Sequence, residues 1–300
     1  MDMTQNKCCR HGASLRRRRR RRRKILRSII FSCSIIAVAV FVAVGSRMIT
    51  SGDGGTNRYD VEAGNNTYNN AVIENSKISE KNKIQNEQSM LDDIMNSTQY
   101  PKQLQELALK NEEALEFVYD YPTEHVKEHT IDLTEEASMD SVPLFVQWDK
   151  RWGYEKYSGN FFAASGCGPT TLSMVVVYLT HNRDASPIAV AKYSKEAGYS
   201  VDGSGSSWTL ISEGCRHYGV KAKTVALDES RMKAELDAGH PIVVNVGPGD
   251  FTDTGHFMVI TGYDDEGFSI NDPNSIEKSG KRWLFKNISS QIRAVWSMYV

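Results

Sequence analysis

The pattern of apolar and polar residues divides the chain into an N-terminal apolar run, a polar stretch and a larger patterned body. Residues 28–45 read SIIFSCSIIAVAVFVAVG and contain no charged side chain. At about 1.5 Å of rise per residue, such a run covers the roughly 30 Å hydrocarbon core of a bilayer. The pattern therefore predicts a transmembrane helix over residues 28–48.

The stretch after the apolar run is polar, and its periodicity changes once along its length. Residues 49–88 are rich in Asn, Gly, Ser, Lys and Glu and show no sustained period, which predicts a flexible linker. In residues 89–140, apolar positions recur at roughly helical spacing between Pro101 and Pro122. Asn111, followed by two glutamates, is typical of a helix N-cap. We expect two short helices here, forming a helical arm that leads into or packs on the main body.

In the body, residues 141–300, helical patterns come first and strand patterns follow. The predicted helices begin at Cys167 and span 186–198, 207–219 and 228–239. The predicted strands are 142–147, 241–247, 256–263, 267–273, 282–285 and 294–300. This order favours an α+β domain with helices packed on an antiparallel sheet.

Charge is distributed unevenly, although the formal net charge of the chain is only -1. The first 47 residues hold 13 of the 36 Lys and Arg residues, most of them in the basic tail 1–27. Because this tail directly precedes the apolar run, we expect it to contact lipid phosphates and not nucleic acid. Arginines on the N-terminal flank predict a cytoplasmic N-terminus and an extracellular C-terminal domain. The alternative is a cleaved signal peptide and a secreted domain, but the run exceeds the usual 7–15 apolar residues of such signals.

The segment SGCGPT, residues 165–170, places Cys167 between two glycines at a predicted helix start. Pro169 suits the first helical turn, where its missing N–H has no partner. A cysteine at this position lies at the positive end of the helix dipole, which lowers its pKa. The same letters also fit half of a disulfide with Cys215, or a small residue in a tight turn, so a nucleophile is one of three interpretations.

A nucleophilic cysteine needs a base, and His256 fits because it opens the apolar strand HFMVITGY. A hairpin through DDEG would return the chain so that Asp272, after the next strand, lies near His256. The sequence leaves the register open, and an odd offset would turn Asp272 to the other face of the sheet. The alternatives are a core histidine with a structural partner and an aspartate that forms a turn before Pro273. Cys, His and Asp in this order are typical of papain-type enzymes.

Two blocks carry a resemblance to a known family: VPLFVQWDKRWGYEKYSGNFFAASGCGPTTLSMVVVYLT and GDFTDTGHFMVITGYDDEGFSINDPNS. They resemble papain-like cysteine peptidases related to bacteriocin-processing (double-glycine leader) peptidases, from about Val142 to the end of the sequence. The segment YPKQLQELALKNEEALEFVYDYP resembles one often found before such domains in surface proteins of Gram-positive bacteria.

The resemblance implies a papain-like fold, in which an N-terminal helix carrying the cysteine packs on an antiparallel sheet carrying His and Asp. It implies Cys167 as nucleophile, His256 as general base and Asp272 as the residue that orients the imidazole. It also implies that Gln147 supplies an oxyanion-hole donor. Gln147 lies 20 positions before Cys167, a wider spacing than in better-known papain-like enzymes.

These observations together predict a membrane-anchored, outward-facing cysteine peptidase acting on a peptide or protein, with no metal or organic cofactor. Asp250 and Asp253 near His256 match no metal-site spacing. The alternatives are hydrolysis of the peptide stems of peptidoglycan by the same residues, and an inactive papain-like module for binding at the cell surface. No G-x-x-x-x-G-K-[ST] motif is present, which argues against a role in leader-peptide export.

Overall fold

The computed structural model describes residues 61–300, with side chains described from Lys77 onward. The predicted basic tail 1–27 and transmembrane helix 28–48 lie outside the described residues. Among the helices that the structure does describe, none is long and apolar enough to cross a membrane. The chain divides into two compact units, Met1–Val72 and Ile73–Val300, and the body lies within the second.

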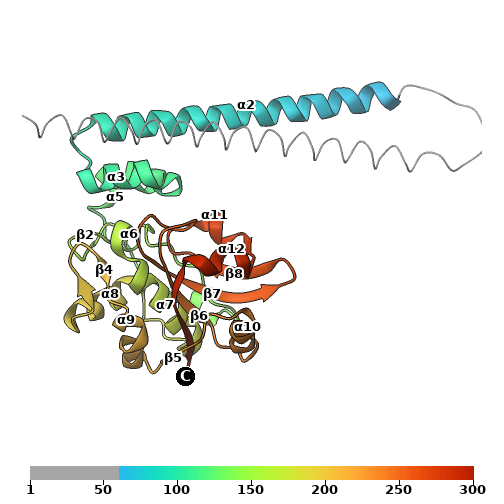
Figure 1. The fold of residues 1–300 in the computed structure, drawn as a ribbon. Helices are drawn as coiled ribbons and strands as arrows, with labels where there is room; N and C mark the ends of the chain where they lie inside the picture. Colours follow the sequence, from blue (N-terminus) through green and yellow to red (C-terminus); the bar gives the residue numbers. More distant parts are fainter. Residues whose placement is uncertain (1–60) are drawn as a thin grey trace, which may run out of the picture. The chain divides into compact units, whose positions relative to one another are not determined.

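Helix α2 runs from Val61 to Asn96 (Figure 1). The prediction of a flexible linker over 49–88 is therefore wrong from residue 61 onward. The segment contains no proline, and polar pairs one turn apart support the helix, as where Gln88 Nε2 donates to Asp92 Oδ1 at 2.8 Å. The apolar residues of the segment, apart from Met90, Leu91 and Ile94 near its end, do not form a stripe with a helical period, so the sequence gives no sign of the helix.

The helical arm consists of several short helices, as the two proline boundaries suggested. They are α3 (Lys102–Lys110), η1 (Glu112–Ala114), α4 (Leu115–Tyr119) and α5 (Tyr121–Glu124). The predicted cap is confirmed, because the Asn111 side chain accepts from Glu113 N at 3.1 Å. Leu104 and Val118 pack with Phe161 in one buried cluster, so the arm rests on the body.

The body is built on a six-stranded antiparallel sheet in the order β5-β10-β6-β7-β8-β9. The strands are β5 (Lys221–Thr224), β6 (Ile242–Val246), β7 (His256–Asp264), β8 (Gly267–Asn271), β9 (Arg282–Trp283) and β10 (Ile292–Tyr299). Five of them were predicted, whereas the charged strand β5 was not. Two small hairpins flank the sheet: β1 (Lys156–Tyr157) with β2 (Asn160–Phe161), and β3 (Ser200–Val201) with β4 (Gly205–Ser206).

One face of the sheet is covered by the helices that precede it in the sequence (Figure 1). These are η2 (Glu136–Ser138), α6 (Phe162–Ser165), α7 (Cys167–Thr180), α8 (Pro187–Glu196), α9 (Thr209–Ser212) and η3 (Gly214–Tyr218). Leu172 and Val176 of α7 pack with Phe257 and Val259 of β7. The predicted α+β arrangement, a cysteine-bearing helix on an antiparallel sheet, is therefore confirmed.

The opposite face holds a second buried cluster, covered by helices from the C-terminal half. Helices α10 (Glu229–Asp237) and α12 (Phe285–Ile288) contribute Met232 and Ile288, which pack with Val244 and Met258. The short elements α11 (Ile276–Ser279) and η4 (Ser289–Gln291) complete the chain. Because both faces are covered, the central strands read as nearly continuous apolar runs in the sequence.

Two predicted elements of the body differ in the structure. Residues 142–147 form no strand: the two carbonyls at its start accept from Asn271 Nδ2 at 3.0 and 3.1 Å. Gln147 N donates to Pro273 O at 2.7 Å, and Pro143 has no N–H to give to a ladder. The segment is thus held by a loop and a side chain and not by strand pairing.

The predicted helix 207–219 is two short helices, α9 and η3, with the first beginning at Thr209. The backbone leaves helical geometry at Glu213, where φ is -128°. Gly214 follows, and a Cβ there would lie 3.0 Å from the Tyr199 ring, so close packing at this glycine accompanies the break.

Candidate active site

Cys167 is the first residue of α7, and the glycines on either side of it allow the tight approach to the helix. A Cβ on Gly166 would lie 2.6 Å from the Phe162 ring, and a Cβ on Gly168 would lie 2.6 Å from Ser206 Oγ. Both positions are therefore too crowded for any side chain. Cys167 itself is partly exposed and lines a cleft.

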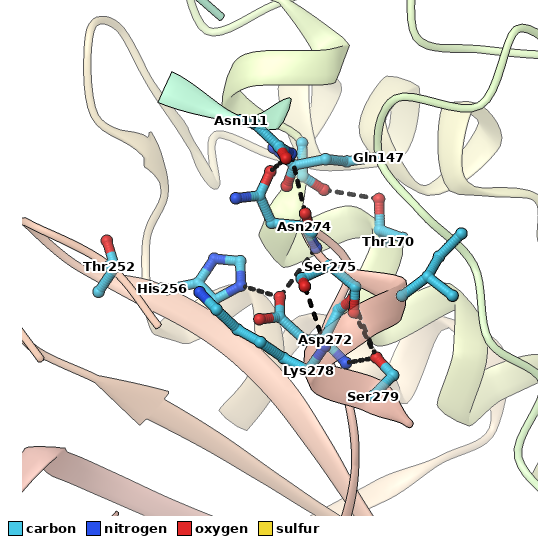
Figure 2. Close-up of polar contacts among 12 residues, drawn as sticks. Asn111, Gln147, Thr170, Thr252, His256, Asp272, Asn274, Ser275, Lys278 and Ser279 are labelled. Carbon is cyan, nitrogen blue, oxygen red and sulfur yellow. Dashed lines mark hydrogen bonds and ion pairs between the residues drawn. The ribbon is translucent and has the colours of Figure 1, made fainter. Parts of the chain in front are cut away.

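His256 and Asp272 are buried and form a direct hydrogen bond (Figure 2). His256 Nε2 lies 2.6 Å from Asp272 Oδ1, and Asp272 is fully buried. Because Nε2 faces the carboxylate, the second ring nitrogen, Nδ1, is left for the contact with Cys167. The side chain of His256 shifts the pKa of Cys167, and Cys167 shifts that of His256, so the three predicted residues lie close to one another.

A β-bulge in the β7–β8 hairpin decides the side on which Asp272 lies. The pairing changes by one residue at Thr261, between the pairs Gly262↔Ser269 and Ile260↔Ile270. Continued past the bulge, this register sets Asp272 opposite Met258, on the face that His256 shares. A shift of one residue moves every later side chain to the other face, so the bulge brings Asp272 to His256.

The loop after β8 fixes the Asp272 carboxylate (Figure 2). Its Oδ1 also accepts from Asn274 N at 2.8 Å, and Asp272 N donates to Ser279 Oγ at 2.9 Å. Asp272 Oδ2 is buried and has no hydrogen-bond partner. A buried carboxylate with one unpartnered oxygen is costly unless a positive charge lies beside it, and the His256 ring can supply that charge.

The pKa of Cys167 is lowered and the pKa of His256 is raised, and both shifts favour the charged form of the side chain. Burial alone raises the pKa of Cys167, but the hydrogen bond and charge of His256 outweigh it and lower that pKa below its ordinary value. Backbone N–H groups of Phe257 and Gly168 act in the same direction. Burial alone lowers the pKa of His256, but the charge and hydrogen bond of Asp272, together with Cys167, raise it. The arrangement favours a thiolate beside an imidazolium.

Gln147, the predicted oxyanion-hole residue, is buried beside the segment that leads into α7. Its Nε2 donates to Ala163 O at 2.7 Å, and its Oε1 has no partner. An amide nitrogen carries two hydrogens, so one donor of Nε2 is unaccounted for by this bond. The assignment of Gln147 to an oxyanion hole stays a prediction.

The disulfide that the sequence left open is not formed, because Cys167 and Cys215 are both free. Cys215 is fully buried in η3, in the core between the helices and the sheet. Burial raises the pKa of Cys215 to about 11, which keeps this thiol neutral. The two cysteines therefore differ in exposure and in acidity, and only Cys167 has the environment of a nucleophile.

A cleft of about 690 Å³ opens beside Cys167. Its walls include Ser206 and Trp208 on one side and Asn245 and Phe257 on the other. Among the described residues, no group of three His, Cys, Asp or Glu side chains is placed to hold a metal ion.

Two residues near the site were missed in the sequence, although one had a readable signal. Asn245 is buried in β6, and its Nδ2 donates to His256 O at 3.2 Å. A lone asparagine inside the apolar run 241–247 could have indicated it. The Asn274 backbone N–H, which holds Asp272, has no side-chain signature and could not have been found.

The helical arm also reaches the Asp272 loop. Asn111 Nδ2 donates to Asn274 O at 2.9 Å and to its Oδ1 at 3.1 Å (Figure 2). The Glu113 carboxylate accepts from Ser275 Oγ, and from the backbone N–H groups of residues 276 and 277 at 2.7 and 3.0 Å. Glu113 therefore caps α11, the helix that follows Asp272.

Comparisons with known proteins identify a family and two similar structures. The family model described as Peptidase C39 like matches residues 139–300. Among curated proteins, none matches the chain. Among solved structures, the chain is similar to the peptidase domain of Streptococcus ComA, a bi-functional ABC transporter involved in quorum sensing. That likeness has 19% identity, covers 45% of this chain and 90% of that one, and has a TM-score of 0.37. A C39-like peptidase from Bacillus anthracis shares 16% identity, with 56% and 97% covered and a TM-score of 0.33.

Proposed function

The chain belongs to the Peptidase C39-like family, and we propose that it is a cysteine peptidase whose reaction uses Cys167, His256 and Asp272. The observation that carries this proposal is the buried His256–Asp272 hydrogen bond, with His256 close enough to Cys167, the first residue of α7, to lower the pKa of its thiol. The family supports a peptidase, and the geometry supports the thiol as its nucleophile.

In the proposed reaction the Cys167 thiolate attacks the carbonyl carbon of a peptide bond. The attack forms the C–S bond and gives a tetrahedral intermediate, while the proton of the thiol resides on His256. His256 gives this proton to the leaving amine as the C–N bond breaks and a thioester remains. Water then attacks the thioester, giving up a proton to His256, and the carboxylic acid product leaves as the thiol is regenerated. Asp272 stabilises the imidazolium and holds the ring with Nδ1 toward the sulfur.

The tetrahedral oxyanion requires hydrogen-bond donors near the sulfur. The backbone N–H of Cys167, at the start of α7, is one proposed donor, and the helix dipole there favours negative charge. The second amide hydrogen of Gln147 is the other. Removing one oxyanion-hole donor typically lowers kcat by about 10²–10³-fold, so Gln147→Ala tests this role.

We further propose that the peptidase is anchored in the membrane by residues 28–48, with the N-terminus cytoplasmic and the catalytic body extracellular. The uncharged run of 28–45 and the arginines before it support this placement. Cleavage after the apolar run, which would release the body, is the alternative. Mass spectrometry of the mature N-terminus together with membrane fractionation separates the two.

A thiol-reactive activity probe tests the proposed reaction. We expect labelling of Cys167 in the full chain, none in Cys167→Ala and a rate lowered about 10²-fold or more in His256→Ala. Cys215→Ala is the matched control and keeps the labelling, since that thiol is buried and neutral. Absence of labelling under reducing conditions would indicate a binding module instead of an enzyme.

The substrate class is tested separately. We expect hydrolysis of peptides or unfolded proteins, measured as new amino termini by mass spectrometry. Release of peptides from purified peptidoglycan, with no hydrolysis of ordinary peptides, would instead favour a stem-peptide hydrolase that uses the same residues.

A further inference from the structure

We propose that Arg293 binds a carboxylate of the peptide substrate in the cleft beside Cys167, and so gives the peptidase a preference for anionic peptides. This inference rests on the proposed peptidase function and names the chemistry of its substrate. Nothing in the sequence patterns singled out Arg293.

A bulge in strand β10 presents Arg293. The pairing of β10 with β6 changes register between Ile292 and Ala294, with Ile292 opposite Val246 and Ala294 opposite Asn245. Arg293 is therefore the extra residue of the bulge and has no partner on β6. Bulges of this kind are over-represented next to active sites, where they redirect a side chain. Both facing residues, Asn245 and Val246, line the cleft.

The guanidinium of Arg293 lies against the backbone of Gly247. A Cβ at position 247 would lie 2.5 Å from Arg293 Nε and 2.8 Å from its Nη2. The glycine thus leaves room for the planar group to rest on the chain just beyond β6. A side chain held in this way loses less conformational entropy when it binds a ligand than a free surface arginine would.

The charge of Arg293 has no carboxylate partner among the residues that the structure describes. Among the described residues that line the cleft, Arg293 is the one Lys, Arg, Asp or Glu residue. No carboxylate in the described part of the chain forms an ion pair with it. Asp250, in the loop after β6, instead accepts from the Gln291 amide at 2.8 Å. The positive charge therefore lies at the cleft with no carboxylate of the described residues paired to it.

A carboxylate is the group in a peptide that fits this site. The guanidinium presents parallel N–H donors that match the two oxygens of a carboxylate, and such charge-assisted pairs are about twice as strong as neutral hydrogen bonds. Aspartate or glutamate side chains and a free C-terminal carboxylate share this chemistry. The half-exposed Trp208 on the same cleft offers an apolar surface for a neighbouring side chain.

Peptide pairs that differ by one charge test the preference. A set with Glu or Gln at each position, and a second set with a free or amidated C-terminus, is incubated with the full chain. We expect kcat/KM to be about tenfold or more higher for the anionic member, and the set that responds identifies the source of the carboxylate. In Arg293→Gln this ratio falls to about one, whereas Arg293→Lys retains part of it. Arg216→Gln, which removes an exposed arginine outside the cleft, keeps the wild-type ratio.

A second measurement needs no substrate. Iodoacetate carries a carboxylate and iodoacetamide is its neutral counterpart, and both alkylate a thiolate with loss of iodide. The ratio of their rates at Cys167, read by mass spectrometry of the peptide that contains it, reports the local positive charge. We expect Arg293→Gln to lower this ratio by about threefold or more at low ionic strength, with Arg216→Gln unchanged.

The outcomes separate the two proposals. If peptides are hydrolysed with no preference for a carboxylate, or if the preference survives in Arg293→Gln, Arg293 has no role in recognition and the peptidase assignment stands. If no peptide is hydrolysed and Cys167 is unreactive, the peptidase assignment fails. A reactive Cys167 whose alkylation ratio is the same in the wild type and Arg293→Gln overturns the role of Arg293 independently of any substrate.

Discussion

The contact between the helical arm and the Asp272 loop makes the arm a positioning part of the site. Glu113 lies in the arm, and its carboxylate accepts from Ser275 Oγ and from the N–H groups of residues 276 and 277, in the first turn of α11. That helix in turn holds Asp272, because Ser279 Oγ accepts from Asp272 N at 2.9 Å. Glu113→Ala therefore removes these three bonds, although Ser275 Oγ still accepts from Lys278 N as the N-cap of α11, and it should loosen the residue that orients His256.

The expected magnitude follows from the bonds lost. Loss of an N-cap costs about 0.5–2 kcal/mol, and hydrogen bonds to a charged group contribute about 1.5–3 kcal/mol each. Water replaces part of this, because Ile276 at the same turn is 51% exposed. We expect the free energy of unfolding to fall by about 1–3 kcal/mol. If the poorer orientation of Asp272 raises the activation free energy by about 1–2 kcal/mol, kcat falls by roughly 5- to 30-fold.

Two measurements on the full chain check this expectation. Urea unfolding followed by tryptophan fluorescence gives the change in stability, and peptide hydrolysis or Cys167 labelling gives kcat and the pH profile. We expect KM to change little, because Glu113 does not line the cleft. Glu116→Ala, which removes an exposed acid from the same arm, is the matched control.

A specific result would refute the reasoning. If Glu113→Ala matches Glu116→Ala in kcat and in unfolding free energy, the cap has no influence on Asp272. If stability falls but kcat and the alkaline limb of the pH profile stay unchanged, the arm stabilises the fold without positioning the site.

Three further predictions concern the site and the hairpin that carries it. Asp272→Asn keeps an oxygen for His256 but buries an unpartnered NH2 and removes the negative charge, so kcat should fall about 10²–10⁴-fold. Because the lost charge no longer raises the pKa of His256, the alkaline limb of the pH–rate profile should move to lower pH. The pKa of Cys167 is lowered and that of His256 is raised, so the thiolate–imidazolium pair forms as pH rises through the pKa of Cys167 and is lost as pH rises through the pKa of His256. Alkylation of Cys167 by iodoacetamide should therefore begin below the ordinary thiol pKa. In His256→Ala this onset should move to higher pH. Gly267 has φ +134°, and a Cβ there would lie 2.6 Å from a carbonyl oxygen of the paired strand, so Gly267→Ala should lower the free energy of unfolding by about 2–4 kcal/mol in thermal melts. Gly280→Ala should change it little, because a Cβ there would lie at an ordinary contact distance of 3.6 Å from its nearest neighbours.

The sequence predicts the central sheet well because strands such as 241–247 and 256–263 are short apolar runs bounded by turn residues. It also brings Cys167, His256 and Asp272 into one hypothesis, because each stands at the end of a recognisable element. What it does not predict is the face on which Asp272 lies. That depends on the bulge at Thr261, for which the sequence carries no signal that we recognised.

Features that depend on distant segments are absent from any local pattern. Asn111 and Asn274 are 163 positions apart, so neither residue alone indicates their contact. Helix α2 is missed for a different reason, which is local: its sequence has no apolar stripe that would reveal a helical period. The segment 142–147 has the composition of a strand, but its hydrogen bonds go to a loop and an asparagine side chain.

The position of β10 in the sheet determines when, during synthesis, the sheet beside Cys167 can be completed. Residues 292–299 pair with β5 on one side and with β6 on the other, so this late segment lies inside the sheet (Figure 1). During synthesis, the sheet that holds His256 stays incomplete until that segment leaves the ribosome. A nascent chain would then carry Cys167 beside an incomplete sheet until β10 had been made.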